Sequence, residues 1–308
     1  MYSTFKPIIT EDTYLFASML DWEADLRSIY YNRNKLRQPE QMWLRAVSHA
    51  SRVGEAVRKG EFLESIEGLC RTIAWTITTV DKLISIQPSE VTYLEGGDGR
   101  KLTSTWDLIV DKYPNACPYC GQTEACHCGI IRLDLEKEDK VSRRNRLRKV
   151  RSERRINSEA SNSLPTSLPD IAMMFGRLYQ QTHYGVDIEK ICFHFLEEVG
   201  EVAWCLTSLQ EGGVRNEDDV SLQVQLAEEF ADTMAWSFAI TGKLAYLSSQ
   251  TTMLSDIRNL TNLVNKTPKS HLETGSLLLP SWLWYVYGGV EHGFLICPAC
   301  QERPCNCQ

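Results

Sequence analysis

The sequence lacks any apolar run long enough to cross a bilayer as a helix. The longest run, Leu277 to Tyr287, falls short of the roughly 20 residues that a membrane span needs, and Pro280 interrupts it. The segment from Met1 to Pro7 has no basic stretch followed by an apolar one, so it does not resemble a secretory signal. We therefore expect a soluble, cytoplasmic protein.

Two other patterns are also scarce. Few stretches alternate apolar and polar residues with period two, which disfavours β-strands. Positive charge is in deficit, because 33 Lys and Arg residues against 40 Asp and Glu give a net charge of -7. This balance argues against a protein that covers nucleic acid with its whole surface. The 43% of apolar residues can nevertheless supply the cores of two ordinary domains, so disorder throughout is not expected.

The positive charge that is present is concentrated in one segment. Between Lys140 and Arg155 the only acid is Glu153, and most of the other residues are Lys or Arg. Charge runs of this kind are usually solvated linkers or exposed helices, and we adopt that interpretation. A contact with phosphate or nucleic acid is the alternative.

The chain repeats itself in three blocks that occur in the same order. Residues 74–83 read AWTITTVDKL, and residues 235–244 read AWSFAITGKL. Upstream, Val53-Gly54-Glu55 matches Val199-Gly200-Glu201. Downstream, CPYCGQTEACHC at 117–128 matches CPACQERPCNC at 297–307. Three matches in one order indicate a tandem duplication.

Apolar residues recur three or four positions apart, which is the period of an amphipathic helix. One stripe runs from Ile188 to Leu206 and a second from Leu226 to Phe238, with Gly212-Gly213 as a turn between them. We therefore expect an all-α protein made of two helical-bundle units.

These patterns divide the chain into five parts. The first unit covers residues 1–116, with a Cys-rich motif at 117–128, and the second covers 169–296, with a Cys-rich motif at 297–308. Residues 129–168 contain the basic segment and the run SEASNSLPTSLP, which has the composition of a linker. We expect Asp170 to cap the first helix of the second unit.

Two pairs of acids have the spacing of one helix face. Glu198 and Glu201 lie three positions apart within LEEVGEV, and so do Glu229 and Asp232 within EEFADTM. A single pair of this kind is usually a solvated face. Two antiparallel helices, however, would bring all four carboxylates together beside an apolar seam, where a cation must relieve their repulsion. Oxygen-only ligation favours Mg²⁺ that is shared with substrate phosphates.

The order Glu-Glu-x-x-Glu, spacer, Glu-x-x-Asp resembles the MazG family of nucleoside triphosphate pyrophosphohydrolases. The resemblance covers residues 169–245 well and residues 20–85 weakly. It implies a four-helix core, bound Mg²⁺, and hydrolysis of a nucleoside or deoxynucleoside triphosphate to monophosphate and pyrophosphate. Matched residue by residue, it implies a water-activating role for Glu197 and a ligand role for Glu198, Glu201, Glu229 and Asp232.

Two further residues share these helix faces. Lys243 follows Asp232 by about three helical turns, so it either contacts phosphate or is a surface lysine, which is commoner. His194 lies one turn before Glu198. It either contacts the substrate or is a partly buried structural histidine, which we favour.

The first unit lacks most of these acids. At the positions of Glu197, Glu198, Glu229 and Asp232 it has Ser51, Arg52, Gly68 and Arg71. Only Glu55, opposite Glu201, is an acid. Arginines in place of acids should repel Mg²⁺, so we expect the first unit to be noncatalytic.

The apolar framework of the first unit persists even so, with Trp75 and Leu83 at matching places. Since members of the resembled family commonly dimerise, the duplication implies an intramolecular pseudo-dimer. Arg52 and Arg71 either reach the substrate or pair with acids such as Glu67, and we favour pairing.

Eight of the 11 cysteines fall in two groups of four. They are Cys117, Cys120, Cys126 and Cys128, then Cys297, Cys300, Cys305 and Cys307. In a cytosolic chain, CxxC followed by CxC favours a structural zinc ion over disulfides. Iron–sulfur or redox chemistry is the alternative, and His127 is a substitute ligand for one thiolate.

Two functions from different classes fit these features. The first is the Mg²⁺-dependent hydrolase, acting on a nucleoside triphosphate, with further copies of the chain as partners and no membrane. The second is a noncatalytic nucleotide-sensing adaptor that binds nucleic acid or a protein through its basic segment and zinc motifs. Because a scaffold does not need the complete set of acids, the sequence favours the enzyme.

Overall fold

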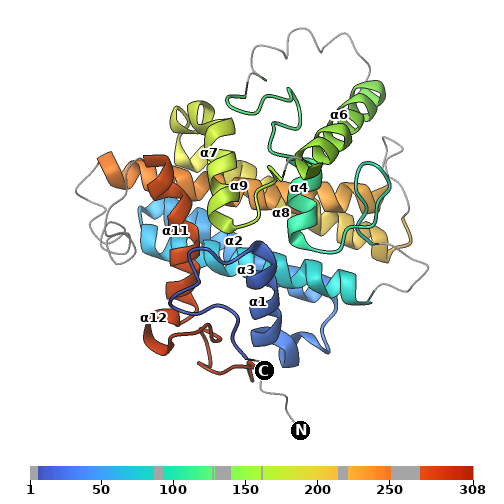
Figure 1. Cartoon of the computed structure of the whole chain (residues 1–308). Helices are drawn as coiled ribbons and strands as arrows, with labels where there is room; N and C mark the ends of the chain where they lie inside the picture. The colour runs from blue at the N-terminus through green and yellow to red at the C-terminus, as the bar shows by residue number, and fades with distance from the viewer. Residues whose placement is uncertain are drawn as a thin grey trace.

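The computed structural model describes residues 6–86, 93–126, 128, 140–160, 162–213, 221–250 and 271–307. These ranges are mostly helical and contain no β-strand, which confirms the all-α class. The helices, drawn in Figure 1, are α1 (Met19–Asn34), α2 (Pro39–Lys59), α3 (Phe62–Ile86), α4 (Thr105–Lys112), α6 (Lys140–Ala160), α7 (Leu168–Tyr184), α8 (Ile188–Gln210), α9 (Leu222–Gln250), α11 (His271–Val286) and α12 (Gly289–His292). No described helix is both long and apolar enough to span a membrane.

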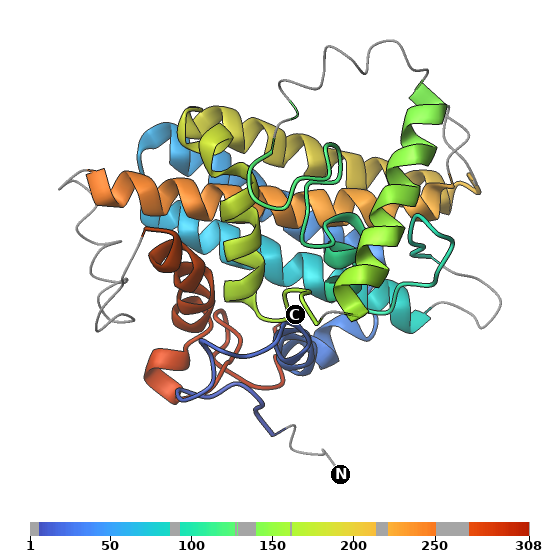
Figure 2. The ribbon, with the colours of Figure 1, turned by 45° about the horizontal axis from the view of Figure 1, so that its top comes forward.

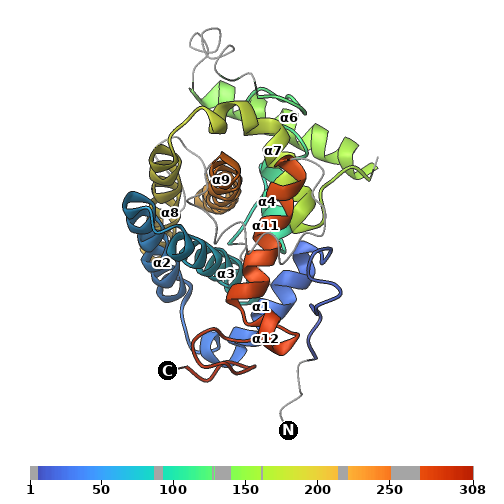
Figure 3. The ribbon, with the colours of Figure 1, turned by 90° about the vertical axis from the view of Figure 1, so that its left-hand side faces the viewer.

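Four long helices form the centre of the molecule. The hairpin of α2 and α3 packs against the hairpin of α8 and α9, with α2 alongside α8 (Figure 3). Trp43 of α2 joins the two hairpins: its indole Nε1 donates to the Val199 carbonyl at 3.0 Å, and its ring meets Phe230 edge-on at 5.2 Å. Since Trp43 and Phe230 are fully buried, this contact anchors the core between the two halves of the chain.

Local signals explain where several helices begin and end. Ser18 caps α1, with Asp21 completing the capping box, and Ser167 and Asp170 make the same pair of bonds at α7. Asp170 therefore lies inside the first turn. The capping residue is Ser167, three residues before the one that the sequence predicted. Gly60 ends α2 in the left-handed conformation, with φ of 74°.

Each cysteine motif lies on the opposite half of the chain. The Cys126 amide donates to the Leu178 carbonyl of α7 at 2.8 Å, and the Cys305 amide donates to the Ile29 carbonyl of α1 at 2.6 Å. Of the preceding helices, α4 packs mainly on α9 of the other half, whereas α11 packs mainly on α7 and α9 of its own half and also reaches α3. The two halves therefore exchange their cysteine motifs.

The basic segment forms α6, which crosses the long helices α8 and α9 in Figure 2. It is a helix with many exposed residues, which is one of the two forms expected for a charge run, but it is not wholly solvated, because Arg151 and Arg155 are buried. Arg155 lies 3.1 Å from Asp98 and 3.8 Å from Asp111, and Arg151 donates to Glu228 at 2.9 Å. A charge run does not reveal its partners when these are distant in sequence. The side chains of residues 140–144 lie outside the described part.

We predict that residues 169–308, produced alone, aggregate or form a homodimer. The α2 and α3 hairpin covers the apolar faces of α8 and α9, and removing it exposes a patch large enough to drive association. Size-exclusion chromatography with light scattering measures the result. A stable monomer of this fragment would show that residues 1–129 are an independent module.

Candidate metal centres and active site

Three of the predicted acids converge on one point. Glu198 of α8 and Glu229 and Asp232 of α9 each offer a carboxylate oxygen, and these oxygens all lie within 4.8 Å of one another. Glu229 and Asp232 are buried, and Glu198 is half-buried. The antiparallel packing of α8 and α9 therefore produces the convergence that the i, i+3 spacing predicts.

This proximity perturbs the protonation of the acids. Burial, followed by the negative charge of Asp232, raises the pKa of Glu198 above its ordinary value. Burial also raises the pKa of Glu229, more strongly than the Lys112 ammonium lowers it. Both shifts show that the charged forms of these acids lack sufficient compensation by cations.

Lys112 and Tyr113 of the first half reach this group, which the sequence did not predict. The buried Lys112 ammonium binds Asp232 Oδ2 and the Glu228 carbonyl, the latter at 3.3 Å. The Tyr113 hydroxyl donates to Asp232 Oδ1 at 2.6 Å. Lys112 and Tyr113 lie 120 and 119 residues from Asp232, so no local pattern could have identified this contact.

Glu228 links α6 to the same region. Its side chain accepts hydrogen bonds from Arg151 at 2.9 Å and from Arg148 at 3.4 Å. Burial acts to raise the pKa of Glu228, but Lys112, Arg151 and Arg148 together lower it to about 2. Glu228 is therefore a stable carboxylate beside the three crowded ones.

The other predicted residues border the group and lie outside it. Glu201 is exposed, although its charge contributes to the raised pKa of Glu198 and Glu229. Glu197 is also exposed and lies 3.1 Å from Nδ1 of His194. The His194 ring, itself partly exposed, stacks on Trp236 at 4.9 Å.

Trp236 and Lys243 also lie on α9. The Trp236 indole donates to Glu198 Oε1 at 3.2 Å and so helps to orient that carboxylate. Lys243 is buried, so the surface-lysine interpretation is wrong. Its ammonium lies 5.4 Å from the centre of the Tyr246 ring. No described contact joins Lys243 to the three acids.

The corresponding region of the first half carries ion pairs. Arg71 binds Glu67 at 2.5 Å, as we favoured, and Glu55 binds Lys59 at 2.6 Å. A Cβ atom at Gly68 would lie 3.0 Å from a methyl group of Val53 and 3.2 Å from the backbone oxygen of residue 49. The first half therefore lacks both the acids and the space for one of them.

The two cysteine groups have the geometry of metal sites. In the first, Sγ of Cys117 lies 3.6 Å from that of Cys126 and 3.5 Å from that of Cys128. In the second, the Cys297–Cys307 and Cys300–Cys305 pairs are 3.8 Å and 3.7 Å apart. Thiolates around one tetrahedral zinc at about 2.3 Å lie about 3.8 Å apart.

All of these thiols are free, and their separations are far longer than the roughly 2.05 Å of a disulfide bond. Each group of four could hold one zinc ion. An amide also donates to a thiol in each group, from Cys128 to Cys126 and from Cys307 to Cys305, both at 3.4 Å. His127, the alternative ligand, lies outside the described residues.

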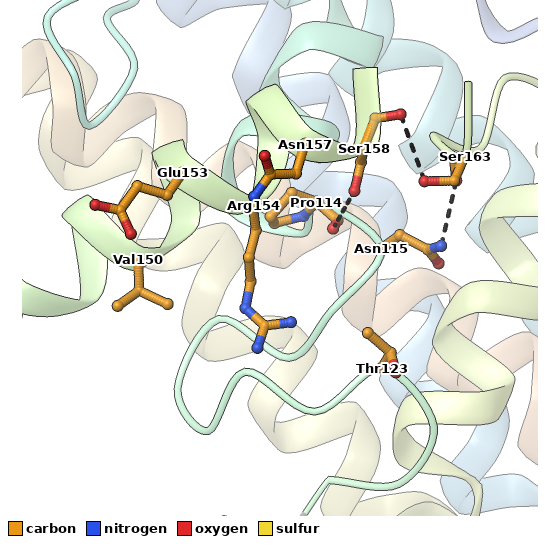
Figure 4. A pocket seen from close by; sticks show the side chains of 9 residues that line it. All are labelled: Pro114, Asn115, Thr123, Val150, Glu153, Arg154, Asn157, Ser158 and Ser163. Atoms are coloured by element: carbon orange, nitrogen blue, oxygen red, sulfur yellow. Dashed lines mark hydrogen bonds between the residues drawn. The ribbon is translucent and has the colours of Figure 1, made fainter. Parts of the chain in front are cut away.

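A cavity of about 510 Å³ lies between α6 and the loop that leads to the first cysteine group. Figure 4 shows the residues that line it, which are Pro114, Asn115, Thr123, Val150, Glu153, Arg154, Asn157, Ser158 and Ser163. The only charged residues among them are Glu153 and Arg154, so the cavity offers no group of acids to a divalent ion. The carboxylate group and this cavity are separate features.

We predict that the purified chain carries about two zinc ions, and that Cys117→Ser and Cys297→Ser each lose about one. Removing a thiolate from a closed four-sulfur site leaves an incomplete coordination shell, which binds zinc weakly. Elemental analysis after exhaustive dialysis measures the stoichiometry. Zinc-free protein with mapped disulfides would contradict the assignment.

A comparison with known proteins finds no matching family model, no matching curated protein and no matching solved structure.

Proposed function

We propose that this protein hydrolyses a nucleoside or deoxynucleoside triphosphate to the monophosphate and pyrophosphate, with Mg²⁺. The observation that carries this proposal is the convergence of Glu198, Glu229 and Asp232 from two facing helices. The resemblance of their motifs to those of the MazG family supplies the reaction. Both raised carboxylate pKa values support it, because a divalent cation at this point would supply the missing compensation.

The donor set suits this metal. Carboxylate oxygens are the ligands that Mg²⁺ prefers, and three of them leave coordination positions for water and for phosphate oxygens. Bound Mg²⁺ would neutralise the triphosphate and lower the pKa of an attacking water. The residues of the chain would orient the ligands: Trp236 holds Glu198, while Lys112 and Tyr113 hold Asp232. Glu197 and Glu201 are exposed, and the charge of Glu201 acts on both Glu198 and Glu229.

We also propose that the two halves form an intramolecular pseudo-dimer with one active unit. Their equivalent contacts support this, since the third cysteine of each group bonds to the first helix of the other half. Ser18 and Ser167, which cap those two helices, face each other in an antiparallel bridge. Such a reciprocal contact is expected where a two-fold axis relates equivalent segments.

The noncatalytic adaptor receives less support. Its nucleic-acid contact relied on the basic segment, and several arginines of α6 are instead committed to acids of this chain. Arg148 and Arg151 bind Glu228, and Arg155 binds Asp98 and Glu159. A protein that uses its basic side chains internally has fewer of them for phosphates.

We predict that Glu198→Gln and Asp232→Asn lower Mg²⁺-dependent pyrophosphate release by more than about 100-fold, because each removes a charged ligand. The matched control is Glu55→Gln, the acid that the first half retains, which should keep wild-type activity. The assay is pyrophosphate and monophosphate release from a panel of ribo- and deoxyribonucleoside triphosphates.

The Glu198→Gln protein should melt no lower than the wild type in the absence of metal, since the change relieves repulsion between acids. Full activity in well-folded Glu198→Gln and Asp232→Asn would contradict the ligand assignment. If the wild type releases no pyrophosphate but binds nucleic acid with a steep salt dependence, the adaptor becomes the better interpretation.

We further predict that Arg52→Glu, Gly68→Glu and Arg71→Asp together do not create a second active site. A side chain at position 68 has no room beside Val53, and Ser51 stands where the second half has Glu197. The triple variant should lose stability through overpacking, by about 1–3 kcal/mol. Measuring turnover per chain in a background that also carries Asp232→Asn isolates the new site, and any Mg²⁺-dependent turnover there would contradict this prediction.

A further inference from the structure

We propose that the active site is composite, and that the tail of the first half completes it. The first tail is defined as Lys112 to Cys128, and the second tail as Val286 to Cys307. In this proposal Lys112 and Tyr113 are positioning residues for Asp232, and the first cysteine group holds them in place. The inference rests on the proposed function for its reaction, and its structural part is tested separately through metal binding.

The contact is specific to both oxygens of one carboxylate. Lys112 binds Asp232 Oδ2, and the Tyr113 hydroxyl donates to Oδ1. Because each carboxylate oxygen has two lone-pair directions, these two bonds fix the orientation of Asp232 and still leave it able to bind a metal ion. Charge-assisted bonds of this kind are among the stronger ones in proteins. The first tail thereby sets the geometry of a ligand on the other half of the chain.

The first cysteine group is attached firmly to the second half. Cys117 follows Tyr113 by four residues and accepts a hydrogen bond from the Tyr179 hydroxyl at 3.6 Å. The Cys126 amide bonds to the Leu178 carbonyl, and the Tyr113 ring packs edge-on against Phe175 at 4.9 Å. Three contacts with α7 therefore connect the thiols to the positions of Lys112 and Tyr113. Loss of the metal would release this connection.

The second tail is an internal comparison in which the tyrosine does not contact an acid. Tyr287 also precedes a cysteine group, but its hydroxyl accepts from the Tyr30 hydroxyl at 3.2 Å and meets no acid. Tyr287 stands ten residues before Cys297, whereas Tyr113 stands four before Cys117, and the residue that precedes the tyrosine is Val286 in the second tail and Lys112 in the first. Val286 and Arg71 line the same cavity of about 390 Å³. Only the first tail, beside the intact acids, carries an ammonium group at this place.

The first tail also carries a half-exposed aromatic ring. Tyr119, between Cys117 and Cys120, is 51% exposed, while the second tail has Ala299 at that position. A half-exposed ring of this kind is suited to stacking on a nucleobase.

The central experiment compares Tyr113→Phe with Tyr287→Phe in the full chain. Each removes one hydroxyl from a buried tyrosine, but only the first hydroxyl bonds to a proposed ligand. We expect Tyr113→Phe to weaken Mn²⁺ binding, measured by calorimetry without nucleotide, and to lower kcat, each by about tenfold, the equivalent of one hydrogen bond. Tyr287→Phe should change neither. Equal effects of the two substitutions, or none from Tyr113→Phe, would overturn the proposal.

Lys112→Met should give a different signature. Removing a positive charge beside the acids should tighten Mn²⁺ binding by about tenfold or more, whereas turnover falls because Asp232 is no longer held. If Lys112 had a purely structural role, its removal would instead weaken both Mn²⁺ binding and turnover.

Tyr119→Ala should raise KM several-fold with little change in kcat, whereas Tyr119→Phe should keep the wild-type KM.

A matched pair of cysteine variants tests whether the first cysteine group holds Lys112 and Tyr113 in place. Cys120→Ser and Cys300→Ser should each lose about one zinc ion, but only Cys120→Ser should weaken Mn²⁺ binding and lower kcat. Circular-dichroism melting confirms that each variant is folded. Wild-type protein that binds Mn²⁺ and releases no pyrophosphate would overturn the proposed function alone. Normal Mn²⁺ binding in folded Tyr113→Phe and Cys120→Ser would overturn the composite site alone, and a wild type that does not bind Mn²⁺ would overturn both.

Discussion

The structure around the candidate site depends on the ion pair between the Lys112 ammonium and Asp232. Asp232 is one of three crowded carboxylates. Glu198, Glu229 and Asp232 share a volume in which their oxygens lie within 4.8 Å. Lys112 is itself buried, so neither its charge nor that of Asp232 is compensated by water. Burying such a pair is costly, and its net contribution to stability is close to neutral. A buried ion pair favours the arrangement in which its partners meet, and here that arrangement joins the two halves of the chain.

This contact accompanies the packing of α4 across the two halves. Lys112 reaches Asp232 because α4, which also contacts α1 and α3 of its own half, packs on α9. The cysteine group that follows α4 is then carried onto α7, where the Cys126 amide finds the Leu178 carbonyl. A small metal-binding motif would stabilise a chain end that has little core of its own. The position of the first cysteine group is thus linked to the contact between Lys112 and Asp232.

The sequence predicted the parts of this site that depend on local spacing. The i, i+3 acid pairs and the apolar stripes placed Glu198, Glu229 and Asp232 on facing helices, and the CxxC and CxC spacings brought the thiols together. It did not predict Lys112, Tyr113 or the arginines of α6, because their partners are set by tertiary packing. The match between α1 and α7 was also missed. It is visible in the capping serines and in the Tyr30 and Tyr179 positions, but few residues are identical there.

Comparison of the two halves shows that they differ on both sides of one contact, in the acids and in the tails. Where the second half has Asp232 facing Lys112, the first half has Arg71 near Val286. A lysine in place of Val286 would bring two cations to the same cavity, and an Asp in place of Arg71 would lack its compensating ammonium. Either change by itself is unfavourable, so the two sides of the contact must differ together. The asymmetry of the tails is therefore physically coupled to the asymmetry of the acids, which is the relation expected if one tail serves one working site.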